Sequence, residues 1–364
     1  MNVPFVDLGK QYQSIKSEID FAMQSVIEDT AFVQGKYVKS FEREFAHVNN
    51  VSHCISCANG TDAIYIVLKA LGIGPGDEVI TVANTWISTA ETITQTGAKA
   101  VFVDIDPRFY TIDVAKIEAQ ITSKTKAIIP VHLFGQPADM DSIVRICNEY
   151  NLFLVEDCAQ SHLAEWDGKK VGTFGVAGTF SFFPGKNLGG FGDGGAIITN
   201  SRSLFDKTKR LRGHGAIKKY DHKFPGRNSR LDTIQSAILS IKLQNYKKVL
   251  TNRKVLASIY ETKLKKIKAI RLFKLKNNNI NSFHQYVIRT NKRNKLKDYL
   301  SKFKIETMVH YPYMLNELNF FSRKKLKNSK NLGNKILSLP ISEEHNKKEI
   351  EFVCKKINNF FKYN

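Results

Sequence analysis

Lys186 stands in a stretch of sequence that suits a reactive amine. It follows an apolar run that ends at Phe183, inside the segment Thr179–Ala196 (TFSFFPGKNLGGFGDGGA), which holds six glycines. Glycine backbone lets a ligand approach closely, and a lysine in a partly desolvated pocket has its pKa lowered enough to act as a nucleophile. The pattern is typical of a lysine that forms a Schiff base. A glycine-rich turn that carries an ordinary surface lysine fits it equally well.

Asp157 follows the apolar run Leu152–Val155 in the segment LFLVEDCAQSH. A carboxylate directly after a buried strand lies at the carboxyl edge of the sheet, where α/β proteins bind ligands. Facing a protonated pyridine nitrogen, it would keep the ring an electron sink. An aspartate here equally suits the N-cap of a following helix, so both interpretations stay open.

Asn59-Gly60-Thr61 directly precedes the amphipathic segment Asp62–Leu71. A Gly-Thr pair at the start of a helix presents free N–H groups, a hydroxyl and the positive end of the helix dipole, which together suit a phosphate group. Simple capping of the helix by a threonine or aspartate is the alternative.

Trp86 is one of only 2 tryptophans and comes just after the apolar run Val79–Val82. Its ring could stack on a flat heterocycle or could fill the core. Taken together, a phosphate anchor, a stacking plane, a pyridinium partner and an amine follow successive strands in one order along the chain. These are the parts of a pyridoxal phosphate (PLP) site.

The elements that must position these residues are short buried strands that alternate with helices between residues 50 and 200. This alternation predicts a parallel or mostly parallel sheet covered on both faces. The expected strands are Val79–Val82, Ala100–Val103, Ala127–Val131, Leu152–Val155, Gly178–Phe183 and Ala196–Thr199.

The composition changes near Gly226–Asp232, after which the pattern predicts one long helical stretch over Thr233–Leu264. A strand at His284–Thr290 and helices at Lys295–Phe303 and Lys347–Phe361 follow. We therefore expect a large domain over residues 1–245 and a small α+β domain over residues 246–364.

The chain has 364 residues, of which 42% are hydrophobic and only 5 are cysteines. The cysteines are scattered along the chain and odd in number, which argues against a disulfide-bonded secreted protein. Cys54 and Cys57 form a CxxC pair, but no second pair or paired histidines complete a metal site, so we expect buried thiols and no metal. The N-terminus lacks a signal peptide and no apolar run approaches ~18 residues, so we expect a cytoplasmic protein without a membrane partner.

The formal net charge of +21 is unevenly distributed. Residues 1–200 hold 15 Lys and Arg against 23 Asp and Glu, a net of −8, whereas residues 201–364 hold 40 against 11, a net of +29. Such asymmetry makes a basic nucleic-acid-binding protein the rival hypothesis. No helix-turn-helix and no basic stripe interleaved with aromatic residues accompanies the charge, so we expect no nucleic-acid partner.

These segments resemble those of the DegT/StrS-type nucleotide-sugar aminotransferases, PLP enzymes of the aspartate-aminotransferase fold (fold type I). The resemblance covers nearly the whole chain and implies an α/β fold, with a mostly parallel sheet in the large domain and a smaller α+β C-terminal domain. It is carried by Val3–Leu8, Phe32–Ala46, Asn59–Ala63, Gly76–Thr89, Val155–His162, Gly178–Gly195, Gly226–Ala237 and His310–Pro312.

The resemblance also implies roles for individual residues. Lys186 would bind PLP as a Schiff base and, once freed, carry the proton, while Asp157 would pair with the pyridinium. Gln160 would approach the 3-oxygen of the ring and Trp86 would cover its face. The phosphate would be held by Gly60, Thr61 and Ser181.

Asn228, in a GxNxR motif, would reach the phosphate of the neighbouring subunit, so the resemblance implies a homodimer with shared active sites. Family members that are dehydratases carry a histidine in place of Lys186. The lysine therefore favours transamination.

The segment Asn84–Ala98 (NTWISTAETITQTGA) resembles the 3-aminotransferases that act on dTDP-3-keto-6-deoxyhexoses. With L-glutamate as the donor, the product would be a dTDP-3-amino-3,6-dideoxyhexose for lipopolysaccharide, O-antigen or other surface polysaccharide biosynthesis. A 4-aminotransferase acting on a dTDP- or UDP-4-keto sugar is the alternative.

Several polar residues of the second half are candidates for contacts with the substrate's diphosphate. His162 stays open between substrate contact and packing. The candidates are Arg212, His214, Lys219, Tyr220, His310 and Tyr311.

Overall fold

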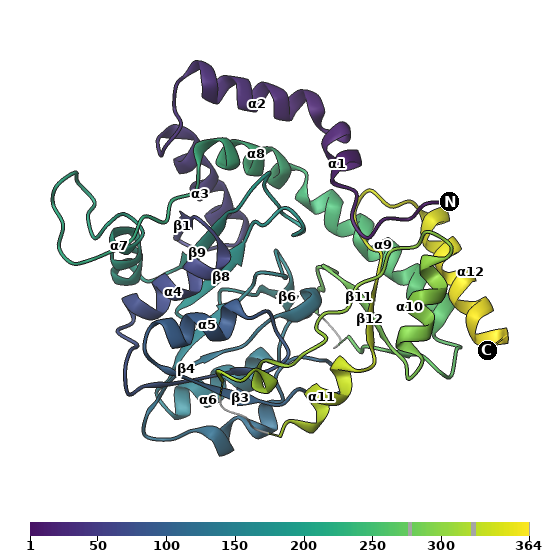
Figure 1. The fold of residues 1–364 in the computed structure, drawn as a ribbon. Coiled ribbons are helices and arrows are strands. Elements are labelled where there is room, and N and C mark those ends of the chain that lie inside the picture. Colours follow the sequence, from purple (N-terminus) through teal and green to yellow (C-terminus); the bar gives the residue numbers. More distant parts are fainter. Residues whose placement is uncertain (276–278, 322–324, 364) are drawn as a thin grey trace.

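A seven-stranded sheet forms the centre of the larger part of the computed structural model, which describes residues 1–275, 279–321 and 325–363 (Figure 1). Its strands are, in spatial order, β1 (His53–Cys57), β9 (Gly195–Thr199), β8 (Ala177–Ser181), β5 (Phe153–Asp157), β4 (Thr125–Ile129), β2 (Glu78–Val82) and β3 (Lys99–Val103).

The sheet is mostly parallel, as predicted. Strands β8, β5, β4, β2 and β3 all run in one direction, and β9 is antiparallel to both of its neighbours, β1 and β8. Strand β1 is therefore parallel to β8. All six predicted strands are present, whereas β1 was not predicted.

Helices cover both faces of this sheet (Figure 1). Successive side chains of a strand point to opposite faces, so Ile197 and Ile198 of β9 belong to two different apolar clusters. One face is covered by α4 (Gly60–Ala70), α5 (Ser88–Gln95) and α7 (Arg202–Leu211), and the other by α3 (Lys36–Val48), α6 (Met140–Glu149) and α8 (Thr233–Gln244).

The prediction of one helical stretch over Thr233–Leu264 is wrong, because the chain forms two helices, α8 and α9 (Tyr246–Leu264), with Asn245 between them. The Tyr246 side chain is buried beneath the large sheet, and its hydroxyl donates to the carbonyl oxygen of His162 at 3.2 Å. This anchor fixes the start of α9, which then leads into the smaller part of the molecule.

The smaller part contains an antiparallel three-stranded sheet packed against helices. The α+β character and the strand at His284–Thr290 were predicted, whereas the two strands beside it were not. Its elements are β10 (Arg271–Leu272), β11 (Tyr286–Arg289), β12 (Ile336–Leu339), α9, α10 (Arg293–Ser301) and α12 (Lys347–Tyr363). The remaining elements are α1 (Leu8–Ser14), α2 (Lys16–Glu28), α11 (Lys327–Gly333), the hairpin β6 (Glu165–Trp166) and β7 (Lys169–Lys170), and the 3-10 turns Val114–Lys116, Glu118–Gln120, Leu133–Gly135 and Leu315–Glu317.

The chain crosses between the two parts more than once. Val3 pairs with Ile305 and is buried in the apolar cluster of the smaller part. In the other direction, Leu315 packs against the large sheet, and its N–H donates to the carbonyl oxygen of Ala83 at 3.1 Å. In the described ranges no helix is both long and apolar enough to span a membrane.

Candidate active site

The loops that follow β1, β2, β5 and β8 meet at one edge of the sheet, because these strands are parallel. Gly60 at the start of α4 lies against Ser181 at the end of β8. A Cβ atom on Gly60 would lie 2.7 Å from the Cβ of Ser181, so only glycine allows this approach. Residues expected to share a phosphate are thus neighbours in space.

Lys186 lies half-buried in the loop after β8, where its backbone N–H donates to the carbonyl oxygen of Phe183 at 2.8 Å. Burial lowers the pKa of Lys186 to about 8, while the negative charge of Asp157 acts in the opposite direction. A minor fraction of the amine, larger than for an ordinary lysine, is therefore unprotonated near neutral pH. Lys186 does not behave as an ordinary surface lysine.

Asp157 ends β5 as a buried carboxylate. Its Oδ2 accepts a hydrogen bond from the Thr89 hydroxyl at 2.7 Å, and its Oδ1 accepts one from the Ala159 N–H at 3.1 Å. Turns, not a helix, follow over residues 158–164, so the N-cap interpretation of Asp157 is wrong. The carboxylate is held toward the same sheet edge as Lys186.

The start of α4 supplies the features of an anion site. Asn59, not Thr61, caps the helix, since its side chain accepts from the Asp62 N–H at 2.8 Å. The Thr61 hydroxyl instead lies 2.7 Å from the Ser88 hydroxyl at the start of α5. Two helix N-termini and two hydroxyls are therefore adjacent, a combination that favours phosphate.

Trp86 does not fill the core, because its side chain is 59% exposed. Its ring centroid lies 5.9 Å from that of Tyr311, whose hydroxyl accepts from Gln160 Nε2 at 3.1 Å. Gln160 is fixed in turn because its Oε1 accepts from the Phe134 N–H at 2.8 Å. An aromatic pair and an amide are thus brought together beside Asp157.

Three histidines surround Lys186, and all three are kept neutral. Burial lowers the pKa of His162 to about 3 and that of His310 to about 4, and the pKa of His284 lies well below its usual value. The positive charge of Lys186 adds to each shift. His310 Nδ1 lies 2.9 Å from the Ser338 hydroxyl, which fixes this ring near the lysine.

His162 is surrounded by aromatic rings. Its centroid lies 5.6 Å from that of Phe180 and 5.8 Å from that of Phe182. Of the two interpretations left open for His162, this environment favours packing.

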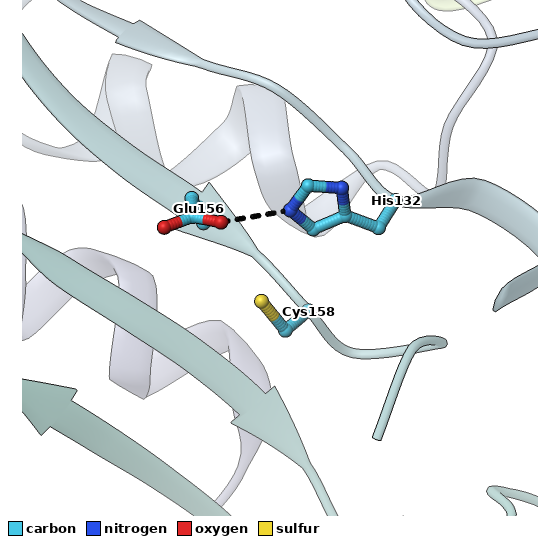
Figure 2. A group of neighbouring side chains, drawn as sticks. All are labelled: His132, Glu156 and Cys158. Carbon is cyan, nitrogen blue, oxygen red and sulfur yellow. Dashed lines mark hydrogen bonds and ion pairs between the residues drawn. The ribbon is translucent and has the colours of Figure 1, made fainter. Parts of the chain in front are cut away.

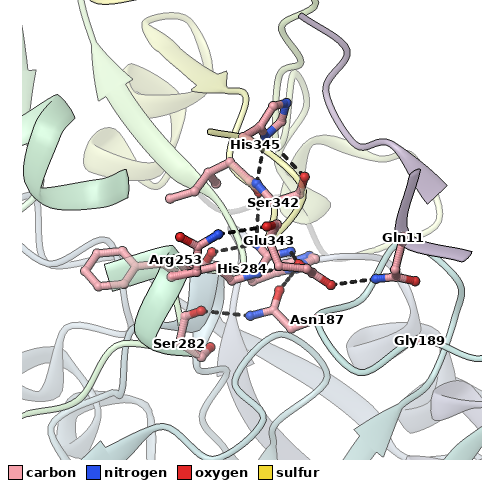
Figure 3. Close-up of polar contacts among 12 residues, drawn as sticks. Gln11, Asn187, Gly189, Arg253, Ser282, His284, Ser342, Glu343 and His345 are labelled. Carbon is pink, nitrogen blue, oxygen red and sulfur yellow. Dashed lines mark hydrogen bonds and ion pairs between the residues drawn. The ribbon is translucent and has the colours of Figure 1, made fainter. Parts of the chain in front are cut away.

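Asn187, the residue after Lys186, ties the lysine loop to the smaller part of the molecule (Figure 3). Its Nδ2 donates to the Ser282 carbonyl oxygen at 2.7 Å, and its Oδ1 lies 3.0 Å from His284 Nδ1. Asn187, His284, Thr89 and Ser88 were not among the predicted site residues. The two hydroxyls stand in NTWISTA after Trp86, which was the available signal.

Arg212 is not placed as a substrate contact would be. Its guanidinium is buried and donates to Glu42 Oε1 at 2.7 Å and to the carbonyl oxygen of Ser56. A buried arginine paired in this way holds α7 to β1. The expected diphosphate contact by Arg212 therefore does not fit its surroundings.

The segment between α7 and α8 projects from the body of the protein (Figure 1). It carries the exposed residues His214, Lys219, Tyr220 and Asn228, and the Tyr220 side chain is 80% exposed. Lys219 lies over the Tyr220 ring, 5.0 Å from its centroid. In the described ranges no hydrogen bond or ion pair joins these four side chains to Lys186 or Asp157.

His132, Glu156 and Cys158 form a buried group that could be taken for a metal site (Figure 2). His132 Nδ1 accepts from the Ala138 N–H at 3.0 Å, so the proton lies on Nε2, which donates to Glu156 Oε2 at 3.1 Å. The Glu156 carboxylate also accepts from the backbone N–H groups of residues 172, 174 and 175. The ligand lone pairs are already used, so the group does not fit a metal.

Cys54 and Cys57 are buried and free, as predicted, and belong to apolar clusters on opposite faces of the sheet. Burial raises the pKa of Cys57 to about 12. The CxxC pair is neither reactive nor arranged to share a ligand.

Comparisons with known proteins agree with this arrangement. The DegT/DnrJ/EryC1/StrS aminotransferase family model matches residues 13–358. A pleiotropic regulatory protein of Geobacillus stearothermophilus is 43% identical, with all of both chains covered. A dTDP-3-amino-3,6-dideoxy-alpha-D-galactopyranose transaminase of Aneurinibacillus thermoaerophilus is 41% identical over 98% of this chain and 99% of its own. A UDP-2-acetamido-2-deoxy-3-oxo-D-glucuronate aminotransferase of Pseudomonas aeruginosa is 40% identical over 98% of this chain and 100% of its own.

Solved structures share the fold over its whole length. DesV of S. venezuelae, crystallised with a ketimine intermediate, has a TM-score of 0.98 at 34% identity and covers 100% of this chain and 99% of its own. NtdA of Bacillus subtilis, crystallised with the bound cofactor PMP, has a TM-score of 0.93 at 29% identity over 99% of this chain and 85% of its own. Both are similar to this chain in the elements that carry Lys186 and Asp157.

Proposed function

Because this chain belongs to the DegT/DnrJ/EryC1/StrS aminotransferase family, we propose that it transfers the amino group of L-glutamate to C3 of a dTDP-3-keto-6-deoxyhexose. Family membership assigns the general chemistry, a PLP-dependent aminotransferase of fold type I that acts on a nucleotide-linked sugar. The acceptor, the donor and the assembly are the proposed part. The products would be a dTDP-3-amino-3,6-dideoxyhexose and 2-oxoglutarate.

The residues at the sheet edge fit PLP. Gly60, Thr61, Ser88 and Ser181 are the residues that would hold the phosphate: the Thr61 and Ser88 hydroxyls are adjacent, and a Cβ on residue 60 would clash with Ser181. The buried carboxylate of Asp157 suits a protonated ring nitrogen. When bound, the cofactor's ring draws electrons from the carbon that carries the transferred amine.

The proposal depends on one observation, the desolvated amine of Lys186. Its Nζ is desolvated enough to be partly neutral near pH 8, as a nucleophile and base must be. In the reaction this nitrogen takes the proton from the α-carbon of the donor amino acid and delivers a proton to the sugar carbon that receives the amine. General acid–base transfer of this kind contributes roughly 10²–10⁴-fold to rate.

Asp157 and the residues around it orient the reaction. Thr89 and the Ala159 N–H hold the carboxylate in one position, from which its negative charge would stabilise a protonated ring nitrogen. Trp86 and Tyr311 provide aromatic surfaces on the solvent side, and Gln160 fixes the Tyr311 hydroxyl. The neutral His162, His284 and His310 add no positive charge beside Lys186.

The choice of a 3-keto acceptor is supported by the names of the relatives. The Aneurinibacillus and Pseudomonas proteins, 41% and 40% identical, both carry position 3 of the sugar in their names. One acts on a dTDP-linked and the other on a UDP-linked sugar, so a UDP-linked 3-keto sugar is the second candidate. A 4-keto sugar linked to dTDP or UDP remains the further alternative.

We also propose that the active unit is a homodimer with shared sites. Support comes from the projecting segment between α7 and α8, where Asn228, Phe224 and Tyr220 are exposed in the single chain. Asn228 would act in the partner's phosphate site, and His214, Lys219 and Tyr220 are available to a substrate held between subunits. We propose that the enzyme acts in the cytoplasm and that its product is used in the biosynthesis of a surface polysaccharide.

The test is an assay of 2-oxoglutarate released from L-glutamate, run against dTDP- and UDP-linked sugars that carry the ketone at C3 or C4. The proposal predicts the highest kcat/KM with the dTDP-3-keto sugar and an amine at C3 of the product by NMR. A UDP-3-keto preference would replace only the nucleotide, whereas an amine at C4 would overturn the regiochemistry.

A further inference from the structure

The small sheet borders a basic cavity that the proposed reaction does not use. Its volume is about 350 Å³, within the range of small-ligand sites. Its lining includes four cationic and two amide side chains, which belong to Lys268, Arg271, Arg289, Lys335, Asn291 and Asn331. The cavity lies where β10 and β11 meet the chain that leads into β12.

Arg271 and Arg289 stand directly opposite each other in the antiparallel pair of β10 and β11. Residues in this relation point to the same face of a sheet with Cβ atoms ~4.5–5.5 Å apart, and like charges so placed destabilise the pair. Their arrangement is therefore unfavourable unless negative charge lies between or beside them.

The chain itself does not supply that negative charge. No acidic residue lines the cavity. Over residues 1–275, 279–321 and 325–363, none of the four cationic side chains has an ion-pair or hydrogen-bond partner. Arg289 and Lys335 are also half-buried, so part of the water that would screen their charges is excluded.

Both arginines act electrostatically on a residue of the larger part of the molecule. The buried Tyr110 belongs to the loop after β3, and burial raises the pKa of its hydroxyl. The positive charges of Arg289 and Arg271 partly oppose this rise. Lys268 and Arg271 are exposed to solvent, whereas Arg289 and Lys335 are half-buried.

This cavity is separate from the active site. His284, which lies beside Lys186, precedes Arg289 by five residues. In extended chain that separation spans on the order of 15 Å. An anion in the cavity would not compete directly for the position of Lys186.

We propose that this cavity is a binding site for a small anion that carries one or two phosphate groups. Guanidinium groups match phosphate oxygens with paired N–H donors, and the amides of Asn291 and Asn331 add neutral donors at the rim. The bound anion would relieve the repulsion between Arg271 and Arg289. It would also couple β10 and β11 to the chain that precedes β12.

The probe is inorganic pyrophosphate, titrated into the holoenzyme in chloride buffer while thermal unfolding is followed. A ligand that binds only the folded protein raises Tm as its concentration rises. The proposal predicts such a rise, with a smaller effect from inorganic phosphate and a loss of both effects at high salt. Wild-type protein whose Tm responds equally to chloride would overturn it.

Two variants separate this site from the active site. Arg271→Gln and Arg289→Gln each remove one cation, and each should weaken pyrophosphate binding at least tenfold. Because like-charge repulsion is relieved, neither should lower the Tm measured without pyrophosphate, whereas removal of a merely structural arginine would lower it. Lys254→Gln, an exposed change of the same charge on α9, is the matched control and should keep full binding.

Two outcomes would contradict the proposal. The Arg271→Gln and Arg289→Gln variants could retain pyrophosphate binding, or Lys254→Gln could lose it to the same extent. Either result would show that pyrophosphate only screens the overall charge. A single-stranded oligonucleotide serves as a competitor. If it binds through the same arginines more tightly than pyrophosphate does, the basic face is a nucleic-acid surface and the small-anion site is wrong.

Discussion

The Thr89 hydroxyl donates a 2.7 Å hydrogen bond to the Asp157 carboxylate, and it joins two loops that are 68 residues apart in sequence. The contact is buried at both ends. It places the start of α5 and the end of β5 in one unit, so the helix that bears Ser88 near the phosphate site also fixes the carboxylate.

Thr89→Val removes this hydrogen bond while the shape of the side chain is kept. A hydrogen bond to a charged group contributes about 1.5–3 kcal/mol, so we expect kcat to fall roughly 10–100-fold and the affinity for PLP to weaken. Steady-state kinetics and cofactor titration measure both. Thr92→Val is the control, because the Thr92 hydroxyl bonds only to the backbone of its own helix. An equal loss in both variants would contradict a specific role for Thr89.

The pKa of Lys186 predicts how cofactor uptake depends on pH. Only the neutral amine attacks the aldehyde, so the rate at which the apoenzyme takes up PLP should rise with pH and level off above about 8. Asp157 raises the pKa of Lys186, so Asp157→Asn should move the plateau to lower pH. Stopped-flow absorbance follows the uptake. A rate that still climbs toward pH 10 would mean that burial does not lower this pKa.

Much of this site was predictable because Lys186 and Asp157 follow buried strands, and the carboxyl ends of parallel strands meet at one edge. Thr89 and Ser88 were missed because hydroxyls at a helix start usually serve as caps. The Asn187–His284 contact was missed because it joins residues 97 apart and has no local signal. Arg212 stands in a basic stretch of sequence that is typical of the surface. Its guanidinium nevertheless pairs in the interior with Glu42, which is 170 residues away. The break at Asn245 carries no glycine or proline to mark it.

The buried, neutral imidazole of His162 should make the fold less stable in acid. Its pKa is about 3 in the folded protein but near 6.5 when unfolded, so between these values the unfolded chain binds more protons. Stability therefore falls as pH falls through this window, by up to about 1.4 kcal/mol per pH unit for one histidine. His162→Phe should make the decline of ΔG of unfolding shallower, measured by urea titration at several pH values. The exposed His47→Gln should leave the slope unchanged, and an unaltered slope in His162→Phe would argue against a neutral buried imidazole.

Glu156 holds the loops behind Asp157. Its carboxylate accepts from His132 at 3.1 Å and from the N–H of Gly172 at 2.7 Å, with two further N–H donors. Glu156→Gln would turn one acceptor into a donor facing N–H groups, so we expect a loss of about 2–4 kcal/mol in urea unfolding. The exposed Glu149→Gln, whose partner is Arg145, should cost less than ~1 kcal/mol.

The hydrogen bonds of His132 and Glu156 also lead us to expect that the protein does not respond to metal removal. Because the lone pairs of His132 and Glu156 are occupied by hydrogen bonds, EDTA should leave Tm and activity unchanged. A drop in Tm that added zinc restores would show that these residues bind a metal after all.

The central claim is that Lys186 is the residue that binds PLP covalently. Lys242 is the matched comparison, since burial lowers the pKa of both lysines to about 8, but the Lys242 ammonium is bonded to Gln11 and the Gly189 carbonyl oxygen. The direct measurement is borohydride reduction of the holoenzyme, digestion and mass spectrometry of the peptides. We predict the cofactor mass on the peptide that contains Lys186, and no adduct and no turnover in Lys186→Ala. The adduct on Lys242 or another lysine, or wild-type turnover in Lys186→Ala, would contradict the account.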